Sequence, residues 1–303
     1  MADLKTEIAG LKLKTPVMVA SGTFGSGGDY ADFVDLDEIG AIVTKSVTLK
    51  PKTGNPPPRI CETPSGMLNT IGLENPGIEN FIKEDIKFLK GYKVPVIVNI
   101  AGETLDEYIE LAAILDKEDR VSGIELNVSC PNVKKGCITF GIDPLATKEL
   151  VRAVKKSTKK PVITKLTPNV TDITVIAKAA EEAGTDAISL INTVMGMAID
   201  INTRKPKLSM GSGGLSGPAI KPIAIRMVNQ VYKAVKVPII GMGGIMNSSD
   251  AIEFILAGAS AVAIGTANFI EPSASVEMAK GIKEYLTTHR ILAIRDIVGK
   301  IIS

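Results

Sequence analysis

The chain has 303 residues, of which 45% are hydrophobic and 22% are charged, and its formal net charge is +2. This is an ordinary globular composition, which excludes disordered and fibrous classes. A charge so near zero gives no electrostatic reason to expect nucleic acid or a membrane surface as a partner. We expect no signal peptide and no membrane span. Three Cys without CxxC spacing and a single His predict a reducing cytoplasm and no metal site.

Short β-branched runs alternate with helical stretches along the whole chain, which is the pattern of βα units and a parallel sheet. Two of these helices end in Ala-Gly, and Gly184 and Gly258 suit the left-handed helix C-cap. The runs are Pro16–Ala20, Ala41–Lys45, Pro95–Ile100, Gly123–Val128, Pro161–Leu166, Ala187–Asn192, Pro238–Met242 and Ala261–Gly265. Eight units at this length predict a single α/β domain over residues 1–303 with the TIM (β/α)8 barrel fold. A doubly wound sheet is the competing architecture, but it would not usually need eight similar units.

Three segments exceed what a minimal barrel requires. Leu4–Lys14 reads as an N-terminal hairpin with Gly10 at its turn, placed to plug the barrel bottom. Val47–Leu73 and Thr193–Gly217 are long loops after strands 2 and 6. Long ordered loops are usually functional, and both follow strand C-termini, the face that holds TIM-barrel active sites.

Polar residues recur at the predicted C-terminal ends of the strands. One of them alone could be a satisfied structural group, but their joint recurrence favours a site. Amides and lysines dominate and carboxylates are nearly absent, which indicates an anionic, hydrogen-bonding ligand rather than a divalent metal. The set is Ser21, Lys45, Ser46, Asn99, Asn127, Lys165, Asn192, Thr193, Gly243, Gly244, Gly265 and Thr266.

The pairs Gly243-Gly244 and Gly265-Thr266 follow strands 7 and 8, where barrels of this kind commonly bind phosphate. Glycine lets backbone N–H groups approach a phosphate closely, although two tight turns would look the same. The glycine-rich run Gly211–Gly217 follows a polar loop rather than a strand, so it is not a dinucleotide-binding fingerprint.

Cys130 lies just past strand 4, between Asn127 and Asn132, with Lys134 and Lys135 nearby. A lone Cys is most often a small buried hydrophobe. A positive field beside a proposed site could instead activate its thiol, so the residues alone leave both roles open. Structural roles are expected for Cys61, Cys137 and His289.

Longer strings resemble class 1 dihydroorotate dehydrogenase over nearly the whole chain. They are Ala20–Gly25, Gly54–Arg59, Gly66–Gly77, Asn127–Lys134 with Phe140-Gly141, Asn192-Thr193, Gly213–Pro218, Gly243–Ile245 and Gly265-Thr266. The stretches Lys50–Pro56 and Asn69–Leu73 are most similar to class 1B, the NAD-linked branch. Cys137 departs from the family pattern, which usually has Gly there, and this bears on the active-site loop. Class 2 members use Ser as the base and carry a membrane-directed N-terminal extension, so Cys130 argues against that class.

The resemblance implies an enzyme that oxidises dihydroorotate to orotate on FMN in pyrimidine (UMP) biosynthesis, with Cys130 as the base. It implies that the substrate lies against Lys45, Asn69, Thr70, Ile71, Gly72, Leu73, Asn127, Asn192 and Thr193. It assigns FMN to Ser21, Lys45, Ser46, Asn99, Asn127, Lys165, Ile191, Gly217, Gly243, Gly244, Gly265 and Thr266. Within these sets, Lys45 would hold the substrate carboxylate and Lys165 would lie beside flavin N1.

Class 1B similarity also implies a homodimer joined by a partner subunit that carries FAD and a [2Fe–2S] cluster, forming a heterotetramer that passes electrons to NAD. This chain lacks four suitable Cys for the cluster. Three alternatives remain open at the level of sequence. They are a fumarate-dependent class 1A enzyme, a Schiff-base TIM-barrel aldolase using Lys165, and a non-catalytic relative.

Overall fold

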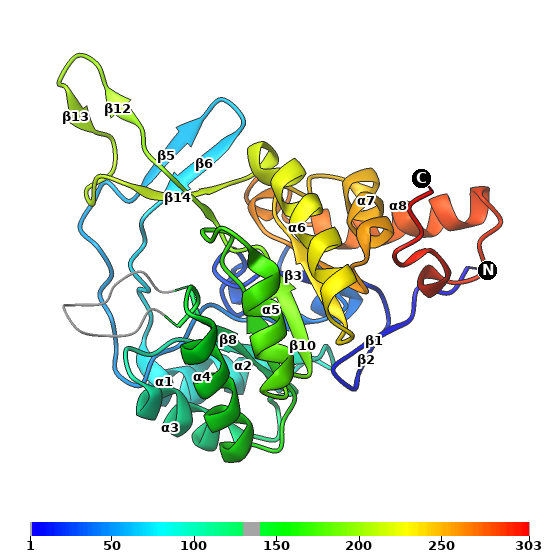
Figure 1. Ribbon diagram of the computed structural model, residues 1–303, viewed down its shortest axis with the longest axis horizontal. Coiled ribbons are helices and arrows are strands. Elements are labelled where there is room, and N and C mark those ends of the chain that lie inside the picture. Colours follow the sequence, from blue (N-terminus) through cyan, green and yellow to red (C-terminus); the bar gives the residue numbers. More distant parts are fainter. Residues whose placement is uncertain (1, 130–139, 303) are drawn as a thin grey trace.

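A closed barrel of eight parallel strands forms the centre of the computed structural model, which describes residues 2–129 and 140–302 (Figure 1). The strands are β3 (Val17–Val19), β4 (Ile42–Val43), β7 (Val96–Ile100), β8 (Gly123–Asn127), β9 (Val162–Lys165), β10 (Ala187–Leu190), β15 (Ile239–Met242) and β16 (Ala261–Ile264). Each pairs with its neighbours in chain order, and β16 closes on β3. The predicted TIM barrel and all eight of its strands are therefore confirmed.

Helices surround the barrel (Figure 1). The longer ones are α3 (Leu105–Asp116), α4 (Pro144–Ser157), α5 (Ile173–Glu182), α6 (Lys221–Ala234), α7 (Ser248–Ala257) and α8 (Ala274–Thr288). Shorter ones are α1 (Gly77–Asn80), the π-helical η3 (Phe81–Ile86), α2 (Lys87–Leu89), and the 3-10 turns η1 (Gly28–Tyr30), η2 (Leu36–Glu38), η4 (Pro218–Ile220), η5 (Thr266–Phe269) and η6 (Ile294–Ile297). Within the described ranges, no helix is long and apolar enough to cross a membrane.

Local sequence fixes where these helices begin and end. The Asp143 side chain accepts hydrogen bonds from the first amides of α4, whose first residue is a proline. Gly184 and Gly258 follow α5 and α7 with φ of 93° and 124°. Both therefore adopt the positive φ that was predicted for them, which costs glycine little.

The predicted N-terminal hairpin is present as β1 (Thr6–Ile8) paired antiparallel with β2 (Leu11–Leu13). Ile8 and Leu13 are buried in one cluster with inward-facing barrel residues such as Met18 and Ile163. The Thr6 hydroxyl donates to the Ser260 carbonyl just before β16. The hairpin therefore closes the end of the barrel where the strands begin.

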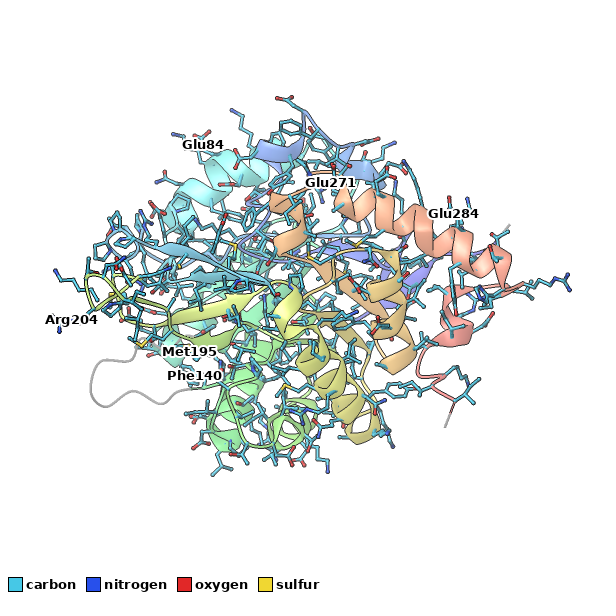
Figure 2. All side chains as sticks on the ribbon, turned by 90° about the horizontal axis from the view of Figure 1, so that it is seen from above. Glu84, Phe140, Met195, Arg204, Glu271 and Glu284 are labelled. Carbon is cyan, nitrogen blue, oxygen red and sulfur yellow. The ribbon has the colours of Figure 1, made fainter. Side chains whose placement is uncertain are left out.

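The two long loops fold together at the other end of the barrel. Loop 47–73 contributes β5 (Ile60–Thr63) and β6 (Gly66–Asn69), and loop 193–217 contributes β11 (Val194–Gly196) and β14 (Gly213–Ser216). They form one antiparallel sheet in the order β11-β14-β6-β5. A hairpin of β12 (Ile199–Asp200) and β13 (Lys205–Pro206) extends from it, and Figure 2 shows Arg204 at its outer end. The sequence predicted both loops but not their pairing.

Candidate functional site

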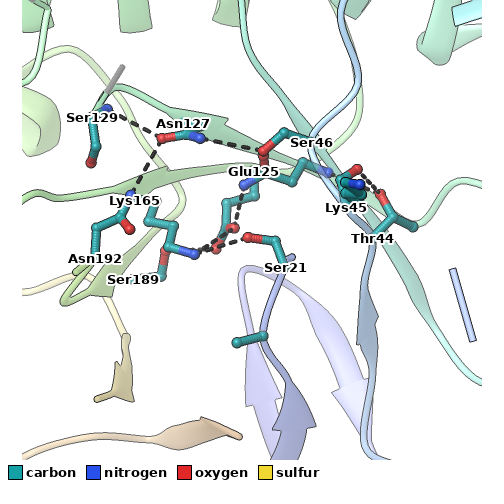
Figure 3. A network of polar contacts seen from close by, with 12 residues as sticks. Ser21, Thr44, Lys45, Ser46, Glu125, Asn127, Ser129, Lys165, Ser189 and Asn192 are labelled. Carbon is teal, nitrogen blue, oxygen red and sulfur yellow. Dashed lines mark hydrogen bonds and ion pairs between the residues drawn. The ribbon is translucent and has the colours of Figure 1, made fainter. Parts of the chain in front are cut away.

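Polar side chains from neighbouring barrel strands meet at the end that carries the paired loops (Figure 3). In the strand register, Asn99 lies beside Glu125, Asn127 beside Lys165, and Lys165 beside Ser189. Alternate residues of a strand point to the same face, so Glu125 and Asn127 both point into the barrel. The register thus gathers side chains from four strands into one network.

Glu125 is the centre of this network, and it is only 1% exposed. Its carboxylate accepts hydrogen bonds from Asn99 Nδ2 at 2.6 Å and from Ser189 Oγ at 2.7 Å. Glu125 lies inside β8 rather than at its end, so the residues at the strand ends predicted a site with almost no carboxylates. Neither Glu125 nor Ser189 was among the predicted site residues. A charged residue two positions before Asn127 in an otherwise apolar strand was the signal that could have revealed it.

Lys165 is buried beside this carboxylate. Its ammonium donates to Ser21 Oγ at 2.9 Å and lies 3.8 Å from the Glu125 carboxylate. Burying either charge alone would cost several kcal/mol, so the two offset each other.

A row of hydrogen-bonded side chains runs from Asn99 to Asn192, and Figure 3 shows its part from Ser46 through Asn127 to Asn192. Ser46 Oγ donates to Asn99 Oδ1, and Asn127 Nδ2 donates to Ser46 Oγ at 3.3 Å. Asn127 Oδ1 then accepts from Asn192 Nδ2 at 3.5 Å, and Asn192 Oδ1 accepts from the Thr193 amide at 2.8 Å. The structure therefore brings together the amide residues predicted at the ends of strands 3, 4 and 6.

The segment 69–73 lies across this end through the antiparallel sheet. Asn69 donates to the Gly214 carbonyl at 3.3 Å, and a Cβ on Gly214 would collide with Thr193. The predicted residues Asn69 and Thr193 therefore lie close together, on either side of Gly214. Asn55 holds the turn that follows Asn69. Its side-chain amide donates to Thr70, and its backbone N–H donates to the Ile71 carbonyl. The same turn includes Gly72 and Leu73, both at positive φ.

Lys45 is half-buried and follows β4. Across residues 2–129 and 140–302, no carboxylate or hydrogen-bond acceptor contacts its ammonium. With Ser46 and Asn75 it lines a cavity of about 340 Å³ whose wall also includes the acidic residues Asp29, Glu84 and Asp85. With three acidic residues in its wall, this cavity is not itself a cationic pocket, and the assignment of an anionic group to Lys45 stays a prediction.

The loops after strands 6, 7 and 8 converge on a second part of the site. Gly217, Gly243 and Gly244 all have positive φ. A Cβ on Gly244 would lie 2.8 Å from the Gly217 carbonyl oxygen, and one on Gly243 would lie 3.2 Å from Ile191. Thr266, which follows Gly265, donates to the Ser216 hydroxyl. In the described part of the chain, the amides of Gly243, Gly244 and Thr266 donate to no protein acceptor. Unpaired amides beside a glycine cradle match the chemistry of a phosphate site.

Cys130, the predicted base, lies outside the described residues, as does Cys137. Ser129 is the last described residue before them, and its amide donates to Asn127 Oδ1 at 3.2 Å. The chain therefore enters this segment directly beside the amide row. Over the described residues, no group of three or more His, Cys, Asp or Glu side chains could hold a metal ion.

Known proteins resemble this chain along its whole length. The family model for dihydroorotate dehydrogenase matches residues 3–286. A protein of Geobacter sp. strain M21 is 58% identical over 297 residues, covering 98% of this chain and 97% of that protein, and is named dihydroorotate dehydrogenase B (NAD(+)), catalytic subunit. A protein of the same name from Thermoanaerobacter pseudethanolicus is 57% identical and covers 99% of both chains. The fold is similar to that of Eimeria tenella DHODH in complex with ferulenol, with a TM-score of 0.83, 24% identity, and coverage of 98% and 88%.

Proposed function

The chain belongs to the dihydroorotate dehydrogenase family, and we propose that it oxidises dihydroorotate to orotate in pyrimidine biosynthesis as the catalytic subunit of an NAD-linked enzyme. The observation that carries the proposal is a buried, paired Lys165 beside a row of amides and a glycine cradle with unpaired amides. This combination suits a planar, hydrogen-bonding cofactor with an anionic tail.

FMN fits the residues at this end of the barrel. Gly217, Gly243 and Gly244, with Gly265 and Thr266, would hold its phosphate through backbone amides. A Cβ at Gly217, Gly243 or Gly244 would press on neighbouring protein atoms, so a side chain there would displace the loops that form the cradle. Lys165 would hold a positive charge near flavin N1, where a fixed cation stabilises the reduced form. Ser21, Ser46, Asn99 and Ile191 would make the remaining contacts to the cofactor.

FMN held there would supply the two-electron acceptor for the hydride from C6 of dihydroorotate. Cys130, as the thiolate, removes the proton from C5. Lys45 and the backbone at Gly72 and Leu73 hold the substrate carboxylate. Asn69, Asn127, Asn192 and Thr193 bind the pyrimidine edge, and amides suit this task because each offers both a donor and an acceptor.

A partner subunit follows from the family branch, since the relatives are named as a catalytic subunit. We propose that the partner carries FAD and a [2Fe–2S] cluster and joins two copies of this chain in a heterotetramer. With three Cys in its sequence, this chain does not supply a four-Cys cluster site. Turnover with NAD only in the presence of the partner would support this assignment, and fumarate turnover by the isolated chain would replace it with the class 1A reaction.

The decisive experiment is anaerobic mixing of the purified protein with dihydroorotate while the visible flavin band is recorded. Rapid bleaching is expected. A yellow protein that does not bleach would reject the substrate, and a colourless protein that cannot be reconstituted with FMN would reject the cofactor. Cys130→Ser should slow bleaching by at least about a hundredfold, because serine is a far poorer base near neutral pH. Unchanged reduction kinetics in that variant would reject Cys130 as the base.

A further inference from the structure

Glu125 touches none of the groups that we assign to the substrate, yet it determines how several of them are oriented. A carboxylate accepts hydrogen bonds and donates none. Asn99 and Ser189 must therefore both turn donors toward it, as they do at 2.6 Å and 2.7 Å. Since Glu125 is 1% exposed, water offers no alternative arrangement.

This constraint passes along the row one residue at a time. Because the Asn99 amide nitrogen is committed to Glu125, its carbonyl oxygen faces Ser46 and accepts from that hydroxyl. Ser46 has a single proton to donate, so toward Asn127 it can only accept. Asn127 therefore turns its nitrogen toward Ser46 and its oxygen away from it.

The last link in the row faces the proposed pyrimidine site. Asn127 Oδ1 accepts from Asn192 Nδ2 and from the Ser129 amide. Asn192 then presents its oxygen to the Thr193 amide at 2.8 Å. Every amide in the row has one direction, and each direction follows from the acceptor-only character of one buried carboxylate.

The same carboxylate balances the charge of Lys165, 3.8 Å away. Lys165 also donates to Ser21 Oγ at 2.9 Å, so its ammonium is held between Glu125 in β8 and Ser21 just after β3. Glu125 is thus paired directly with the cation assigned to the flavin. Through Asn99 and Ser46 it is also linked to Asn127, an amide assigned to the substrate.

We propose that Glu125 is a positioning residue that fixes the donor and acceptor directions of the Asn99–Ser46–Asn127–Asn192 row and holds Lys165 in place. The inference rests on the proposed function, because it concerns orotate and FMN bound at this site. It extends that function by giving the pattern of amide donors and acceptors a physical origin in one buried charge.

The test compares four variants of the FMN-loaded protein. Glu125→Gln removes the charge but keeps an oxygen for Asn99, whereas Glu125→Met removes both. Ser46→Ala interrupts the row and leaves the Glu125–Lys165 pair intact. Asp186→Asn is the matched control, since Asp186 also pairs with a lysine, Lys155 at 2.6 Å, but just before the start of β10. Orotate affinity is measured by titration of the flavin spectrum, and the flavin midpoint potential is measured by equilibration with dyes.

We expect Glu125→Met to weaken orotate binding by at least about tenfold. Ser46→Ala, which removes the hydrogen bonds of Ser46 to Asn99 and from Asn127, should weaken it by about fivefold. The flavin potential should rise in both Glu125 variants, because a negative charge near the reduced flavin is removed. Asp186→Asn should match the unmutated protein in both measurements.

Wild-type orotate affinity in Ser46→Ala, or an unchanged potential in Glu125→Gln, would overturn the inference. If neither Glu125 variant folds, the orotate affinity of Ser46→Ala decides by itself. Failure of the proposed function is distinct from these outcomes, because the unmutated protein itself would then fail to bind FMN or fail to bind orotate.

Discussion

Removal of Lys165 should destabilise the protein strongly, and removal of Glu125 in the same molecule should restore much of the loss. Two unit charges 3.8 Å apart attract each other by about 4 kcal/mol at an effective dielectric constant of about 20. Lys165→Met would leave the Glu125 carboxylate buried and unpaired, which typically costs about 3–5 kcal/mol. Glu125→Gln in the Lys165→Met background removes that charge while keeping an acceptor for Asn99.

The assay is urea unfolding of the apoprotein, so that FMN binding does not contribute to the measured free energy. The sequence contains no Trp, so far-UV circular dichroism is the suitable probe. A cycle of the two single variants and the double variant should give a coupling energy of at least about 2 kcal/mol. A coupling energy below about 0.5 kcal/mol, the range of independent sites, would refute the reasoning that the two charges stabilise each other.

Two further predictions concern the glycine cradle and acid stability. Gly244→Ala should raise the FMN dissociation constant at least about tenfold, because a Cβ there would meet backbone atoms at 2.8 Å. Gly10→Ala is its control, with a φ of 79° against 78° but open space around it, and it should lose about 1 kcal/mol of stability without affecting FMN. Equal FMN affinity in the Gly244→Ala and Gly10→Ala variants would contradict the assignment of the glycine cradle to the FMN phosphate. The hydrogen bond from Thr158, followed by that from the Lys159 amide, lowers the pKa of Asp116 below its ordinary value of 3.8. Its stabilising contribution is therefore present above pH 3.8 and is lost as the pH falls through the lower folded value. The thermal stability difference between wild type and Asp116→Asn should shrink in that acidic range, and a difference independent of pH would contradict the assignment.

The polar residues at the strand ends were predictable because the barrel is a repetitive fold. Once eight βα units are counted, the residues after each strand must lie at one end of the barrel. Asn127, Lys165 and Asn192 could therefore be assigned to one site from the sequence alone. Cys130 stays a prediction carried by family resemblance, because it lies outside the described residues.

By itself, the sequence determined the barrel, its plug, the helix caps and the family, because each depends on local periodicity or on strings of adjacent residues. Only the tertiary structure decided what joins segments far apart in the chain. The pairing of Asn69 with Gly214 makes one sheet of two loops, and it depends on backbone hydrogen bonds that no local pattern specifies. The role of Glu125 was also hidden, since a charge inside a strand is stable only when neighbouring strands bring Lys165, Asn99 and Ser189 to it.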